Sequence, residues 1–100
     1  MLHTVNKSPY EKSSLDTCLR LAKQGSTILL IEDAVYAAIT GSSLESKIKQ
    51  ASKQYEFCVL GPDLKARGLD EAKLIDGIRV VDYGGFVDLA VSHDRVQSWL

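Results

Sequence analysis

Short apolar segments alternate with helically spaced apolar residues along the whole chain. Residues 27–31 (TILLI) form a continuous run rich in β-branched side chains, which is typical of a parallel strand covered on both faces. Further strands are predicted at residues 2–6, 56–60, 78–81 and 96–100. This order predicts an α/β fold in which a small, parallel or mostly parallel sheet carries helices on both faces.

Capping residues and glycines place the first helices between these strands. The first helix begins at Ser13 or Ser14 and ends at Gly25. A short second helix covers residues 33–39, with Asp33 as its N-cap. The apolar stripe of the first helix consists of Leu15, Cys18, Leu19 and Ala22.

The later helices have similar start signals. Residues 42–45 (SSLE) form a capping box for a third helix. Pro62 is well placed at the first position of a helical turn that Gly68 closes. The turn Gly84-Gly85 leads into a last helix with three apolar residues on one side, Phe86, Leu89 and Ala90.

Composition and charge indicate an ordinary soluble globular domain. Of its 100 residues 45% are hydrophobic and 25% are charged, which predicts one domain, residues 1–100, with a single core. Its 12 basic and 13 acidic residues leave a net charge of −1, so no direct nucleic-acid contact is expected. No apolar run approaches the roughly 20 residues that span a bilayer, and the first residues do not resemble a signal peptide. A cytoplasmic protein without membrane contact is therefore expected.

The sequence predicts no metal site and no cofactor. Cys18 and Cys58 lie far apart without zinc-ligand spacing, and His3 and His93 do not make a metal site by themselves. Cys18 belongs to an apolar helical stripe and Cys58 lies inside a strand, so both are predicted to be small buried hydrophobes. A reactive Cys18 would require exposure and a positive neighbour.

Ligands and partners of parallel sheets usually meet the carboxyl ends of the strands. The loops at these ends begin at Asn6, Glu32, Gly61 and Asp82. The pair Glu32-Asp33 occupies the position of a general acid, although capping by Asp33 is the simpler interpretation. Residues 82–85 (DYGG) offer backbone amides to an anion, although such glycines more often mark a tight turn. The alternative function is therefore a stand-alone ligand-binding domain or enzyme that uses Asp33 and the Tyr83-Gly84-Gly85 turn.

Four stretches carry a resemblance that covers nearly the whole chain in order. They are MLHTVNKSP, ILLIEDAVYAA, DLKARGL and DYGGFVDLAVSHDRVQSWL. Together they resemble the TusB/DsrH family, above all through the N-terminal segment LHTVNKSP and the C-terminal segment VQSWL. The resemblance implies a DsrE-like fold and a small subunit of a cytoplasmic sulfur relay.

The resemblance also implies partners. Family members assemble with paralogous TusC/DsrF-like and TusD/DsrE-like subunits, and sulfur carrier proteins are reached through the complex. The relay passes persulfide sulfur toward tRNA wobble-uridine 2-thiolation or, in the DsrH branch, serves dissimilatory sulfur oxidation. The persulfide cysteine belongs to a different subunit, which implies a non-catalytic or accessory chain. Cys18 matches a cysteine typical of the DsrH branch, so it is the candidate persulfide carrier.

Two aromatic residues are candidates for subunit contacts, because aromatic side chains are enriched at the buried centres of interfaces. Tyr36 lies on the short helix that follows the Glu32-Asp33 strand end. Trp99 either packs at the edge of the hydrophobic core and closes it, or anchors a contact with a partner subunit. Phe86 lies on a clear helical stripe, which favours a core position. The sequence is compatible with a homo-oligomer and with a hetero-hexamer.

Overall fold

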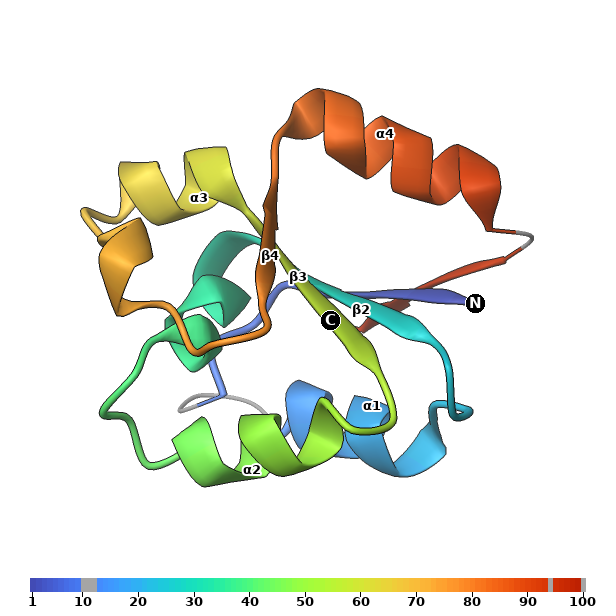
Figure 1. Cartoon of the computed structure of the whole chain (residues 1–100). Coiled ribbons are helices and arrows are strands. Elements are labelled where there is room, and N and C mark those ends of the chain that lie inside the picture. Colours follow the sequence, from blue (N-terminus) through green and yellow to red (C-terminus); the bar gives the residue numbers. More distant parts are fainter. Residues whose placement is uncertain (10–12, 94, 100) are drawn as a thin grey trace.

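A five-stranded parallel sheet forms the centre of the molecule (Figure 1). The computed structural model describes residues 1–9, 13–93 and 95–99. The strand order is β4-β3-β2-β1-β5, and every neighbouring pair is parallel. The strands are β1 (Leu2–Val5), β2 (Thr27–Leu30), β3 (Glu56–Leu60), β4 (Arg79–Val81) and β5 (Val96–Trp99). The predicted α/β class and parallel sheet are confirmed.

Helices cover both faces of this sheet, as predicted. Figure 1 shows α1 and α2 on one side of the sheet and α4 on the other. The α-helices are α1 (Ser14–Leu21), α2 (Glu45–Ala51), α3 (Gly61–Ala66) and α4 (Tyr83–Ser92). Two 3-10 helices, η1 (Glu32–Ala38) and η2 (Glu71–Lys73), complete the set.

The central strand β2 explains why the sequence there is apolar without alternation. All four of its residues are buried. Ile28 and Leu30 belong to the larger core cluster, which also contains residues of α1 and α2. Leu29 points to the opposite face, into a smaller cluster with Cys58 and Leu89 of α4. Apolar side chains on both faces of a strand are expected where helices cover both faces of a parallel sheet.

Two predicted helix caps are wrong. The N-cap of η1 is Ile31, and Asp33 lies inside the helix, with its carboxylate turned to Arg67. The α2 helix begins at Glu45, and its N-cap Leu44 has no side-chain cap bond. Glu45 instead accepts a hydrogen bond from the Gly41 backbone N–H at 2.6 Å, one residue before the predicted box. In both cases the carboxylate pairs with a donor other than its predicted partner: Asp33 with the Arg67 guanidinium, and Glu45 with the Gly41 N–H.

The region before α4 also differs from the prediction. The cap of α4 is Asp82, whose Oδ1 accepts a hydrogen bond from the Gly85 N–H at 2.7 Å, so the helix begins before the two glycines. Gly85 permits close packing, because an added Cβ would lie 3.0 Å from the Val81 Cβ.

The short helix η2 is a further difference, because its residues have no apolar pattern that predicts a helix. Its N-cap Asp70 accepts a hydrogen bond from Ala72 N–H.

Candidate functional site

The helices η1 and α3, which follow β2 and β3, contact each other at the carboxyl edge of the sheet. The Glu32 N–H donates a hydrogen bond to Asp63 Oδ2 at 2.6 Å. Glu32 has a φ of +50°, a conformation that costs energy for a residue with a side chain. The Arg67 guanidinium donates to Asp33 Oδ1 at 2.9 Å. The carboxylates of Asp33 and Asp63 therefore act as acceptors that hold η1 against α3.

The alternative site at residues 82–85 is similarly occupied. The Gly85 amide, which an anion would need, already donates to the Asp82 carboxylate. An incoming anion would also meet the negative charge of Asp82 at close range. Asp33, the proposed general acid of the alternative function, is held in its ion pair with Arg67. The geometry thus gives both carboxylates structural contacts, Asp33 with Arg67 and Asp82 with the Gly85 N–H.

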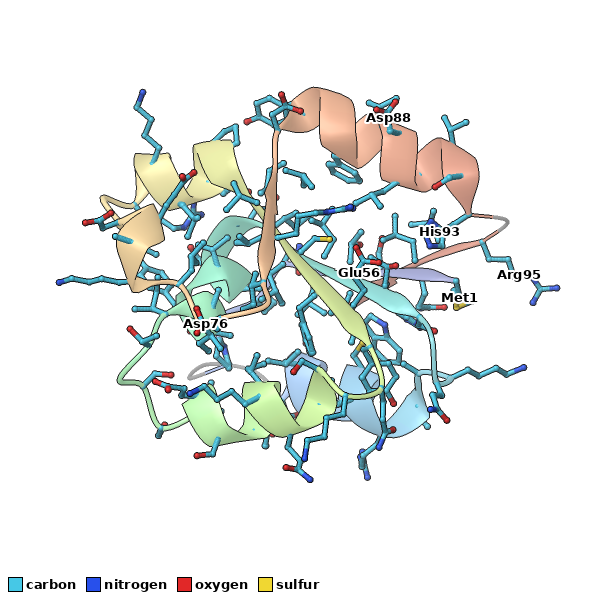
Figure 2. All side chains as sticks on the ribbon, in the orientation of Figure 1. Met1, Glu56, Asp76, Asp88, His93 and Arg95 are labelled. Carbon is cyan, nitrogen blue, oxygen red and sulfur yellow. The ribbon has the colours of Figure 1, made fainter. Side chains whose placement is uncertain are left out.

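We expect Asp63→Ala to lower the free energy of unfolding by about 1–2 kcal/mol, because the strained Glu32 would lose the acceptor of its N–H. Asp88→Ala is the matched control, since Asp88 is exposed on α4 and points away from the sheet (Figure 2). Urea unfolding of both variants measures the difference. Equal midpoints for Asp63→Ala and Asp88→Ala would show that the hydrogen bond between η1 and α3 does not stabilise the fold.

Cys18 lies in the core. Its side chain is 0% exposed and packs in the larger cluster with Leu15 of the same helix and Ile48 of α2. Burial raises the pKa of the Cys18 thiol to about 12. Cys58 is also fully buried, and burial is the main cause that raises its pKa. Both cysteines are free thiols. Neither environment provides the exposed, electropositive setting of a reactive thiolate.

The two aromatic candidates have different surroundings. Tyr36 is 38% exposed on the outer side of η1. Trp99 is half-buried against the larger core cluster, and its Nε1–H donates to His3 Nδ1 at 3.0 Å. Tyr36 therefore offers a free aromatic surface, whereas Trp99 is anchored within its own chain. Phe86 is partly buried against the cluster beneath α4.

Besides Tyr36, the structure exposes an apolar surface that the sequence pattern did not predict. Tyr83, Val87 and Val91 follow one another at intervals of four residues on α4, and they are 61%, 60% and 80% exposed. We call this set the outer stripe of α4. The opposite side of the helix packs on the sheet through Leu89. A helix that is apolar on both sides is typical of an element buried on both sides.

No metal centre and no membrane span are found in the part of the chain that the structure describes. Histidine, cysteine and carboxylate side chains do not gather into groups of three or more there. Nor does any helix of the described residues reach the length and hydropathy of a membrane-crossing segment.

Known structures and sequences resemble the chain over almost its full length. The fold matches the crystal structure of the ychN protein from E. coli with a TM-score of 0.84, covering 97% of both chains at 23% identity. A protein of unknown function from Methanobacterium thermoautotrophicum matches with a TM-score of 0.76 at 17% identity, covering 97% of this chain and 95% of that one. These two likenesses concern the fold, a small α/β domain with a parallel sheet.

The sequence matches are more specific. The family model described as DsrH like protein matches residues 7–96. Protein TusB of Pectobacterium parmentieri is 37% identical over 99 residues, and Protein TusB of Erwinia tasmaniensis is 40% identical over 100 residues. Each alignment covers 99% of this chain and 100% of the relative. The chain therefore belongs to the DsrH-like family, the TusB/DsrH group of sulfur-relay subunits, as the resemblance predicted.

Proposed function

We propose that this chain is a non-catalytic subunit of a cytoplasmic sulfur-relay complex that serves 2-thiolation of the tRNA wobble uridine. The observation that carries the proposal is the similarity to proteins named TusB, which are 37% and 40% identical over 99% of this chain. The burial of both thiols supports a non-catalytic role, because persulfide transfer requires an accessible thiolate. Dissimilatory sulfur oxidation is the other relay of the family, and the TusB relatives favour the tRNA branch.

The proposed partners are paralogous TusC/DsrF-like and TusD/DsrE-like subunits in a hetero-oligomer, with sulfur carrier proteins reached through that complex. The outer stripe of α4 supports this proposal, since it is a continuous apolar surface with no covering element among the described residues. A net charge of −1 gives the chain no electrostatic footprint for tRNA, so contact with the nucleic acid is left to other components.

The test is genetic and chemical. Deleting the gene should remove 2-thiouridine from digests of the tRNAs that normally carry it, as measured by mass spectrometry. Re-expression of the chain should restore the modified base, and so should a Cys18→Ser variant. Normal 2-thiouridine in the deletion strain would contradict the tRNA assignment. Loss of sulfur oxidation in the same strain would assign the chain to the other branch.

Tyr36→Ala should weaken assembly with the paralogous subunits more than it lowers the Tm of the isolated chain. Its ring is partly exposed on η1, and aromatic residues at interface centres contribute strongly to binding. Size-exclusion chromatography of co-expressed subunits measures the assembly, and thermal unfolding of the purified chain measures its stability. An unchanged complex from the variant would place Tyr36 outside the interface.

A further inference from the structure

The strand β5 is attached to the rest of the fold along one side only. It lies at the edge of the sheet, and β1 is its only neighbour among the described strands. Val96, Gln97 and Ser98 are exposed, and Trp99 is the residue of this strand that packs against the larger core cluster. A short edge strand with one packed side chain can open locally while the core stays folded.

One side-chain hydrogen bond ties the Trp99 ring to β1. Its Nε1–H donates to His3 Nδ1 at 3.0 Å, and the two ring centroids lie 6.1 Å apart. An indole N–H can only donate, so His3 Nδ1 must accept, and the ring proton of neutral His3 is on Nε2. The contact therefore exists only while Nδ1 keeps its lone pair.

A second proton on His3 would remove this contact. With a proton on Nδ1 the ring would present a donor to the Trp99 N–H, which is itself a donor. His3 is only 3% exposed, and its buried Nε2 has no hydrogen-bond partner among the described residues. Burial lowers the pKa of His3, with the positive chain terminus as the second cause. The closed arrangement of the two rings is thus specific for neutral His3.

The charged groups closest to the pair on the surface are positive. His3 and Trp99 line a surface hollow together with Met1, Lys23 and Arg95, and the described lining contains no carboxylate. These three residues come from the start of β1, from the connection between α1 and β2, and from the position before β5. Their charges add to the cost of a second positive charge on His3.

The elements that pack on β1 add no negative charge in the described part of the chain. The neighbouring strand β2 has no ionisable side chain. On α1, burial raises the pKa of the Cys18 thiol to about 12, so this thiol stays protonated. The only carboxylate of α1, on Asp16, pairs with Lys47 of α2. A protonated His3 in the closed arrangement would therefore have no described counter-ion.

We infer that the hydrogen bond between Trp99 and His3 is an acid-sensitive switch: when His3 takes up a second proton, Trp99 loses its acceptor and β5 opens from β1. Trp99 is the partner that moves, because it is half-buried at the edge, whereas His3 lies on β1 between β2 and β5. Opening exposes the His3 ring to water, which solvates its charge. The inference concerns the chain by itself and does not rest on the proposed sulfur relay.

The direction of the pH dependence follows from proton linkage. The open state binds a proton on His3 near the ordinary pKa of 6.5, whereas the closed state resists it because its pKa is lower. The closed state is therefore fully favoured above about pH 6.5 and loses stability as the pH falls below that value. Uptake of one proton changes the opening constant of β5 by up to about tenfold per pH unit.

The single tryptophan and the two histidines of the chain make the test specific. NMR of the purified chain follows the His3 ring nitrogens, the Trp99 indole N–H and the exchange of backbone amides between about pH 8 and pH 5. We expect amide protection factors in β5 to fall by up to about tenfold per pH unit below about pH 6.5, while those in β2 and β3 stay constant. The Trp99 indole signal should change with the same midpoint as the protonation of His3.

His3→Asn should remove this pH dependence, because the Asn Oδ1 accepts a hydrogen bond as Nδ1 does and does not titrate. His93→Asn is the matched control, since the His93 Nδ1 lies 2.7 Å from the Leu89 carbonyl oxygen of α4, and this variant should keep the pH dependence. Equal loss of protection in β5 and β2, retained pH dependence in His3→Asn, or its loss in His93→Asn would overturn the inference. So would protonation of His3 with an unchanged Trp99 indole signal, a comparison that uses the unmodified chain and does not depend on the folding of any variant.

Discussion

Val87→Asp should abolish co-purification of this chain with the proposed paralogous subunits while leaving the isolated chain folded. Val87 is the middle residue of the outer stripe of α4 and is 60% exposed in the single chain. A substitution at such a position usually changes the free energy of unfolding by about 0.5 kcal/mol or less. In an assembled interface the same carboxylate would be buried without a partner, which costs several kcal/mol. The substitution should therefore prevent complex formation while the isolated chain remains folded.

The matched control introduces the same charge on another exposed helix. Ser46 lies in the first turn of α2, where a carboxylate is electrostatically favourable. Ser46→Asp should co-purify with the paralogous subunits as the unmodified chain does. If Val87→Asp assembles normally as well, the outer stripe of α4 is not a subunit contact and the proposed interface is wrong.

Cys18 should remain unmodified when the native chain is incubated with a persulfide donor. A pKa of about 12, against the ordinary 9.0, lowers the thiolate fraction near neutral pH by about a thousandfold, and burial restricts access further. The measurement uses a Cys58→Ala background, so that intact-mass spectrometry reports on Cys18 alone. The same chain unfolded in urea should take up one sulfur, which shows that the donor is active.

The outcome that contradicts this expectation is equally specific. One added sulfur mass on the native chain, removed by Cys18→Ser, would identify Cys18 as a persulfide carrier. That result would also overturn the non-catalytic assignment. Loading of the native chain only in the presence of the paralogous subunits would place the carrier role in the assembled complex.

The same raised pKa has a consequence for stability. The native state holds the Cys18 proton up to about pH 12, whereas the unfolded state loses it near the ordinary pKa of 9.0. The protonated Cys18 thiol therefore makes its full contribution to the free energy of unfolding below pH 9. This contribution is lost as the pH rises from 9 toward 12, at about 1.4 kcal/mol per pH unit. Urea unfolding of the unmodified chain and of Cys18→Ala across this range should show a shallower decline in the variant.

The amino-acid sequence determined the elements that local patterns encode. The TILLI run predicted β2 because a strand covered on both faces needs apolar side chains on both faces, and that requirement is visible in consecutive residues. Cys18 and Cys58 were correctly placed in the core, since both lie within apolar patterns of their own elements. The family, too, followed from the sequence, because its signature extends along the chain.

The tertiary structure decided every property that depends on residues distant in sequence. Asp33 looked like a cap because capping is local, but Arg67, 34 residues away, holds its carboxylate. The spacing of Tyr83, Val87 and Val91 is visible in the sequence, yet only the packing of α4 on the sheet shows that this side stays uncovered. The proton on His3 is placed by Trp99, 96 residues later in the chain. Hydrogen bonds and packing between distant segments leave no local pattern, so these features require the folded chain.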